Sequence, residues 1–194
     1  MLLFVLRHIK VRINAFYFGG IMYIVNSKAE DIYLLNITPL DLNYIYKWYN
    51  NEDFKYATGV GKEMTIQQLL RKYIEVKRSE EHFWLGIFNS FTNEMIGFIK
   101  GQIKNGAKTT AWINSLIIDK ALQNRGYGTK AVNLLINFAK KKSNLSKVYI
   151  TVYNGNERGY KFWESLGFKS CGRIEDYIDS GENALEAILM CKSV

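Results

Sequence analysis

One stretch of the sequence joins a strand, a glycine-bearing loop and a helix without interruption. Residues 109–118 form a strand-like apolar run, residues 123–128 read Q-N-R-G-Y-G, and residues 127–142 have the apolar periodicity of an amphipathic helix. The start of such a helix presents free backbone N–H groups and the positive end of the helix dipole. Glycines let a phosphate approach the backbone closely. The stretch therefore predicts an anion site at the beginning of this helix.

The loop differs from two other phosphate-binding motifs. It lacks the first glycine of the dinucleotide fingerprint and the acidic residue about 20 positions later. It also lacks the Gly-Lys-Ser/Thr ending of a P-loop. Taken alone, a Q-x-x-G-x-G string is equally typical of an ordinary strand-to-helix turn. The elements around it are needed to distinguish a phosphate-binding loop from such a turn.

The hydrophobic patterns around this stretch predict a mixed α/β fold. Thr38-Pro39-Leu40-Asp41 and Thr65-Ile66-Gln67-Gln68 have the pattern of helix starts. The element order β-α-α-β-β-β-α-β-α-β-β gives a mostly antiparallel twisted sheet of about seven strands with four helices. Helices do not follow every strand, which excludes a doubly wound fold. Strands are expected at residues 32–37, 83–88, 95–103, 109–118, 148–152, 168–174 and 184–191, and helices at 38–49, 65–79, 127–142 and 157–166.

The net charge and the small number of possible metal ligands limit the classes of binding partner. A net charge of +8 favours anionic partners. The lysines, however, read mostly as solvated helix faces, and the Lys140-Lys141-Lys142 cluster complements a helix dipole, so we expect no nucleic acid partner. Cys171 and Cys191 have no metal-ligand spacing, and His8 and His82 are far apart in the chain. We therefore expect no metal and two reduced thiols, as in the cytoplasm.

The N-terminal segment is expected to lie outside the folded domain. Residues 1–21 are apolar with interspersed basic residues, and contain neither a run long enough to span a bilayer nor a secretory signal. Gly19-Gly20-Ile21-Met22 can be encoded by a ribosome-binding purine run followed by a start codon. We therefore expect natural translation to start at Met22 and the domain to span 22–194, with an extra strand or arm as the alternative. No membrane partner is expected, and the protein is expected to be a monomer or a homodimer.

Three segments in a fixed order resemble the GNAT superfamily of N-acetyltransferases. They are the strand at 112–118, the loop and helix start at 123–131, and residues 156–168, which resemble the family's "Asn … aromatic-Glu-x-x-Gly-Phe" segment. The resemblance covers about residues 30–192 and is strongest over 112–168. It implies the GNAT fold and acetyl-coenzyme A (acetyl-CoA) as cosubstrate. It also implies direct acetyl transfer, in a ternary complex, to a primary amine of a small molecule, an aminosugar or a protein N-terminus.

The resemblance also implies roles for particular residues. Backbone groups of the strand would pair with the pantetheine arm, and a bulge there would turn an N–H toward the thioester carbonyl as an oxyanion donor. The loop amides would bind the pyrophosphate, and Asn156 would hydrogen-bond pantetheine. The expected cofactor-binding residues are Leu116, Ile117, Ile118, Gln123, Asn124, Arg125, Gly126, Tyr127, Gly128, Thr129, Asn156 and Trp163.

The chain departs from the family pattern at two catalytic positions. Trp163 stands where many members have a tyrosine that protonates the leaving thiolate, and an indole N–H is too weak an acid for that step. Tyr160, one turn earlier, is the candidate proton donor, with a packing role or a water as alternatives. Asn114 stands where a carboxylate often serves as base. With Ser115 it can order a water, and no base is assigned.

The acceptor and the competing functions stay open at this stage. Aromatic and acidic residues expected around the acceptor suit an amine or aminosugar, while a protein N-terminus or lysine is the other class. An idle acyl-CoA-binding module is a second hypothesis, and nucleic-acid binding, based on charge alone, is a third. The expected acceptor-side residues are Trp48, Tyr49, Phe54, Tyr56, Trp84, Glu175, Asp176, Tyr177 and Asp179, with Glu52, Asp53 and Glu63 within reach.

Overall fold

The computed structural model describes residues 23–54, 63–174 and 186–194. Two of the predicted features lie outside these ranges: the extension at 1–21 and the last turn near Asp179. Five of the expected acceptor-side residues also lie outside them: Tyr56, Glu175, Asp176, Tyr177 and Asp179. The strands are β1 Asn26–Lys28, β2 Ile32–Asn36, β3 His82–Asn89, β4 Met95–Lys104, β5 Thr109–Ile118, β6 Leu145–Tyr153, β7 Lys169–Ile174 and β8 Ala187–Ser193. The helices are α2 Leu42–Tyr49, α4 Ile66–Lys77, α5 Tyr127–Ser143 and α6 Glu157–Ser165.

The strands form one mixed sheet, which confirms the predicted fold class. Over the described ranges the sheet has eight strands in the order β1-β2-β3-β4-β5-β6-β8-β7, and among these strands only the β5–β6 pair is parallel. The expected count of about seven was one short, because β1 has only three residues and no apolar alternation. Asn36 holds the chain beside this edge: its side chain accepts from the Val25 N–H at 2.8 Å and donates to the Tyr23 carbonyl at 2.9 Å.

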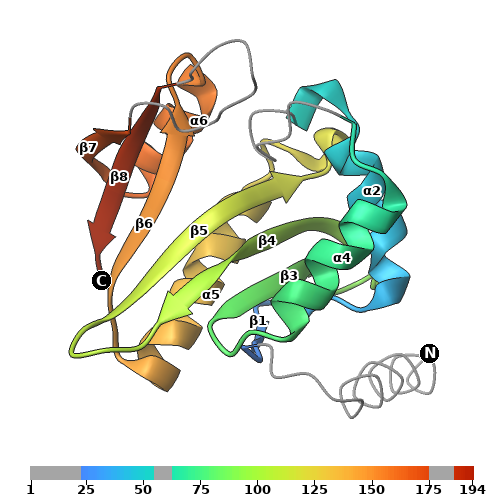
Figure 1. Cartoon of the computed structure of the whole chain (residues 1–194), viewed down its shortest axis with the longest axis horizontal. Coiled ribbons are helices and arrows are strands. Elements are labelled where there is room, and N and C mark those ends of the chain that lie inside the picture. Colours follow the sequence, from blue (N-terminus) through green and yellow to red (C-terminus); the bar gives the residue numbers. More distant parts are fainter. Residues whose placement is uncertain (1–22, 55–62, 175–185) are drawn as a thin grey trace.

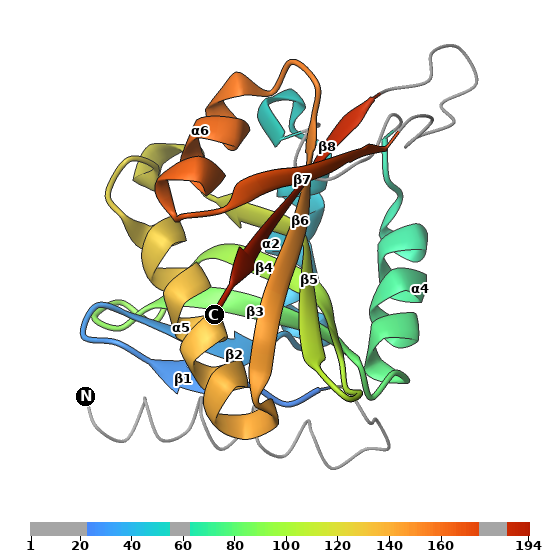
Figure 2. The ribbon, with the colours of Figure 1, turned by 90° about the vertical axis from the view of Figure 1, so that its left-hand side faces the viewer.

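Two hydrophobic cores cover the two faces of the sheet. Helices α5 and α6 lie on one side, and α2 and α4 lie on the other (Figures 1 and 2). The core under α5 and α6 includes Val132, Leu135 and Trp163. The core under α2 and α4 is largely aromatic, with Trp84 and Phe98 fully buried. Helix α4 turns Leu69, Tyr73 and Val76 inward, whereas Leu70 and Ile74, which its apolar periodicity also offers as core residues, are exposed.

The two central strands diverge halfway along their length. Register pairs between β5 and β6 run from Thr109 with Leu145 to Ile113 with Ile150 and end there. Beyond this point β6 continues against β8, so residues 114–118 of β5 leave an open gap toward β6. A parallel pair needs a crossover connection, which α5 supplies. The gap therefore lies beside the start of the crossover helix.

A β-bulge sits where the gap begins. On β4, Lys100 pairs with Ser115 while the next residue, Gly101, pairs with Ile113. Asn114 is the extra residue, and its side chain is exposed. A bulge bends its strand and re-aims the neighbouring backbone groups. The bulge expected in this strand is therefore present, at Asn114.

Candidate active site

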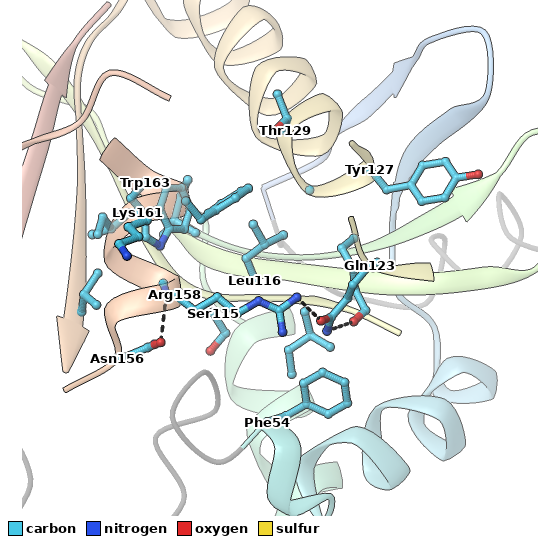
Figure 3. Close-up of a pocket in the computed structure, with 18 of the residues that line it drawn as sticks. Phe54, Ser115, Leu116, Gln123, Tyr127, Thr129, Asn156, Arg158, Lys161 and Trp163 are labelled. Carbon is cyan, nitrogen blue, oxygen red and sulfur yellow. Dashed lines mark hydrogen bonds between the residues drawn. The ribbon is translucent and has the colours of Figure 1, made fainter. Parts of the chain in front are cut away.

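A cavity of about 630 Å³ occupies the gap between the diverging strands. Its walls come from β5, the loop that follows it, the first turn of α5, the end of β6 and α6, with Phe54 closing the side toward α2 (Figure 3). Twelve of the predicted site residues line it: Asn114, Leu116, Ile117, Ile118, Gln123, Asn124, Gly126, Tyr127, Gly128, Thr129, Asn156 and Trp163.

The loop before α5 is fixed from its two ends by side chains. Asp119 Oδ1 accepts from the Ala121 N–H at 3.0 Å, and Gln123 Nε2 donates to the Ile118 carbonyl at 2.9 Å. Gly126 has φ +79° and is the N-cap of α5, so the chain turns sharply into the helix there. The first N–H groups of a helix have no partner within the helix. Gly126, Gly128 and Thr129 all line the cavity, so this start of the helix borders it.

Asp119 also ties this loop to the opposite face of the sheet. Its Oδ2 accepts a hydrogen bond from the indole N–H of Trp48, on α2, at 3.1 Å. No local pattern in the sequence shows this contact, because it depends on α2 packing over the end of β5. Lys120, the next residue, pairs with Asp53 at 2.6 Å. Both contacts hold the loop against α2 and the turn that follows it.

Arg158, on α6, was not among the predicted site residues. Its guanidinium donates to Gln123 Oε1 at 2.7 Å and to Asn124 Oδ1 at 3.3 Å (Figure 3). Both acceptors are neutral, so the contacts leave its positive charge available at the rim of the cavity. Lys161, one turn further on α6, also lines the cavity. The signal that could have found both is their place on the helix expected beside the cofactor.

Asn156 begins α6 as its N-cap. Its Oδ1 accepts from the Gly159 N–H at 2.9 Å, which leaves the side-chain amide to donate elsewhere. A side chain at Gly159 would meet the Asn156 side-chain nitrogen at 2.5 Å, so the close cap needs a glycine there. The spacing of these two residues therefore fixes where α6 starts beside the cavity.

Trp163, Tyr160 and Arg125 differ in how deeply they are buried and in whether they line the cavity. Trp163 is buried, with its ring edge-on to Phe162 at 5.0 Å and to Phe168 at 5.1 Å. Tyr160 is half-buried, packs against the core and is not among the residues that line the cavity. Arg125 is exposed and donates to the Ala121 carbonyl at 3.3 Å, also away from the lining.

Ser115 lies at the side of the bulge that faces α2. It is buried, lines the cavity and hydrogen-bonds the hydroxyl of Tyr49. Burial raises the pKa of Tyr49, and the bond to Ser115 lowers it in part. Tyr49 is therefore neutral at physiological pH and suits a hydrogen-bonding role, not that of a base.

The expected acceptor-side residues divide between core and cavity. Trp48, Tyr49 and Trp84 belong to the buried aromatic core, whereas Phe54 and Asp53 line the cavity. Glu52 and Glu63 are exposed.

Within the described part of the chain, no group of three or more His, Cys, Asp or Glu side chains could hold a metal ion. None of the helices described there is long and apolar enough to cross a bilayer. Cys171 and Cys191 are both free thiols.

The three segments that carry the family resemblance, at 112–118, 123–131 and 156–168, all contribute residues to the wall of the cavity. The chain matches the acetyltransferase (GNAT) domain over residues 34–188. It therefore belongs to the GNAT acetyltransferase family, which confirms the resemblance.

Similar proteins support the same family. Probable N-acetyltransferase YjcK of Bacillus subtilis (strain 168) is 29% identical over 157 residues, covering 75% of this chain and 84% of that protein. Aminoglycoside N(6')-acetyltransferase type 1 of Klebsiella pneumoniae is 21% identical over 164 residues, covering 78% and 80%. A structure of spermidine N-acetyltransferase from Vibrio cholerae, in complex with CoA and spermine, superposes with a TM-score of 0.74 at 17% identity, covering 84% of this chain and 95% of that one. This last likeness shows the shared fold.

Proposed function

We propose that this protein transfers an acetyl group from acetyl-CoA to a primary amine, by direct attack in a ternary complex. The observation that carries the proposal is the cavity between β5 and β6, which has an open strand edge on one wall and the start of α5 on another. The spermidine acetyltransferase of the same fold was solved with CoA. An extended thioester arm joined to a pyrophosphate matches these two walls.

The backbone of the chain would do most of the binding. The helix dipole and free amides at the start of α5 would hold the pyrophosphate. The open edge of β5 at residues 116–118 would pair with the pantetheine amides as an added strand does. The side-chain amide of Asn156 would donate to the same arm. These contacts fix the thioester beside the bulge at Asn114.

The reaction forms a C–N bond and breaks a C–S bond. The bulge would turn a strand N–H toward the thioester oxygen, stabilising the negative charge that develops there. An alkyl ammonium has a pKa near 10, so the site must deliver the amine in its neutral form. Asn114 and Ser115 would order a water that accepts the proton, and we assign no side chain as the base. Cytoplasmic location and a monomeric or homodimeric state stay predictions.

Exchange of Tyr160 for phenylalanine decides whether this residue donates a proton to the leaving thiolate. A general acid typically contributes about 10²–10⁴-fold to the rate. Because Tyr160 is not among the lining residues, we expect kcat of Tyr160→Phe to stay within about threefold of the unchanged protein. The assay is CoA release at saturating acceptor. A fall of kcat by about 100-fold, with the KM for acetyl-CoA unchanged, would establish the donor role instead.

Replacement of Arg158 by methionine is expected to weaken acetyl-CoA binding by about tenfold, because a charge-assisted contact at the cavity rim is lost. Arg125→Met is the matched control, since Arg125 is equally exposed but lies off the lining. Titration calorimetry measures both dissociation constants. Equal effects of the two substitutions would show that Arg158 contributes only general positive charge.

The function as a whole is tested by CoA release from acetyl-CoA over a panel of amines, aminosugars and peptides. We expect release that depends on the acceptor. One relative is named for aminoglycosides, and a structural neighbour was solved with spermine, so both kinds of amine belong in the panel. Acetyl-CoA binding without turnover on any acceptor would favour the alternative, an idle acyl-CoA-binding module.

A further inference from the structure

Lys100 lies in the sheet next to the proposed reaction centre. It is on β4, where it pairs in register with Ser115 of β5 on one side and with Trp84 of β3 on the other. Residues paired across neighbouring strands point to the same face. Ser115 lines the cavity, so Lys100 is one strand away from it on the face that carries α2 and α4.

The ammonium group of Lys100 makes no ion pair with the residues that the structure describes. Among the described residues it has neither a hydrogen-bond acceptor nor a carboxylate within ion-pair distance, and its Nζ lies 4.5 Å from the ring centroid of Trp84. The indole N–H of Trp84 also has no partner in this part of the chain. Charged side chains removed from water are normally paired. Among the described residues, the Trp84 ring is therefore the contact found for the ammonium group, a cation–π interaction, and neither donor has a hydrogen-bond acceptor.

Burial and the neighbouring charges shift the pKa of Lys100. Burial first, and the positive charge of Lys72 second, lower the pKa of Lys100 to about 8, while Glu75 raises it. Both neighbours lie on α4. Lys100 as a whole is half-buried, so part of its side chain still meets solvent. An anionic group of a ligand, bound beside Lys100, would neutralise its positive charge.

The distance to the reaction centre sets the size of such a ligand. Neighbouring strands lie about 4.8 Å apart, and Lys100 Nζ reaches toward β3, one strand beyond its own. The ammonium group is thus about 5–10 Å from β5, and about 10–15 Å from a thioester that pairs with the outer edge of β5 as an added strand. One acceptor molecule of ordinary size could place its amine at β5 and an anion at Lys100.

We propose that Lys100 binds an anionic group of the acceptor, so that the preferred acceptors are amines bearing a carboxylate or phosphate about 10–15 Å from the reacting nitrogen. This inference rests on the proposed function, because it takes the amine to react beside β5. Polyamines and aminoglycosides, which carry only positive charge, would meet Lys100 unfavourably. The opposing account is a purely structural lysine that packs on Trp84.

The experiment compares ω-amino acids of two to twelve carbons with the corresponding amides as acceptors. With the unchanged protein we expect kcat/KM to be about tenfold or more higher for the longer carboxylates than for their amides. Lys100→Met, which keeps an aliphatic stem over Trp84, should reduce this ratio to near one. Lys104→Met is the matched control on the same strand and face, and it should leave the ratio unchanged because Lys104 is exposed.

A second experiment uses thermal melting to measure binding of the same probes in the presence of CoA. It separates the proposed anion site at Lys100 from the proposed acetyl transfer. Stabilisation by the carboxylates that Lys100→Met removes, without turnover on any amine, would support the anion site and overturn the proposed acetyl transfer. Turnover with equal ratios in the unchanged protein and in Lys100→Met would overturn the anion site and leave acetyl transfer standing. Equal loss in Lys100→Met and Lys104→Met would show a general charge effect and would also overturn the anion site.

Discussion

Gly126→Val is expected to weaken acetyl-CoA binding by about 100-fold, a loss of about 2.7 kcal/mol. Gly126 has φ +79°, a conformation that costs other residues about 1–2 kcal/mol and that is a genuine outlier for a β-branched side chain. The loop would relieve this strain by moving, and the amides at the start of α5 would move with it. Isothermal titration with acetyl-CoA measures the change.

Gly167→Val provides the control for backbone strain. Gly167 has φ +83°, close to that of Gly126, but it follows α6 and does not line the cavity. Both variants should lose comparable stability, whereas only Gly126→Val should lose affinity. Unchanged affinity in Gly126→Val, or the same loss in both variants, would contradict the assignment of this loop to the pyrophosphate.

Phe98→Ala should cause the largest loss of stability. Phe98 is fully buried and stacks on Tyr49 with ring centroids 5.7 Å apart, while Trp84 and Trp48 lie at 5.9 and 6.0 Å. Removing a buried phenylalanine costs about 3–5 kcal/mol, and the ring pairs place this one near the upper end. We expect the free energy of unfolding to fall by about 4 kcal/mol and Tm by roughly 8–16 °C.

Phe91→Ala is the matched control, because Phe91 is 75% exposed. Its free energy of unfolding should change by less than about 0.5 kcal/mol. Denaturant unfolding of both variants gives the two values. Similar values would show that the aromatic core under α2 contributes little to stability. In that case the hydrogen bond from Trp48 of α2 to Asp119 would not be supported by a stable core under α2.

Local signals in the sequence predicted the parts of the site that are themselves local. The loop before α5 depends on glycines, on a preceding apolar run and on a following helical period, all within about 35 residues of chain. Of the predicted cofactor-binding residues, only Arg125 does not line the cavity, because its side chain turns back to Ala121.

Features that depend on pairing between distant strands were beyond single-sequence patterns. The bulge was expected only from the family, and its position at Asn114 is set by the register with β4. Arg158 meets Gln123 because α6 folds back over the loop, and nothing in either segment shows this. Lys100 interrupts an apolar strand as any edge lysine would, and only the sheet places it beside Ser115.

The central claim is that acetyl-CoA lies between β5 and β6 with its pyrophosphate on the amides that open α5. Amide hydrogen exchange, measured with and without saturating acetyl-CoA, tests this location directly. The account predicts slower exchange in peptides that cover residues 114–118 and 123–129. Acetyl-CoA binding that leaves exchange in both peptides unchanged, with protection elsewhere in the chain, would contradict it.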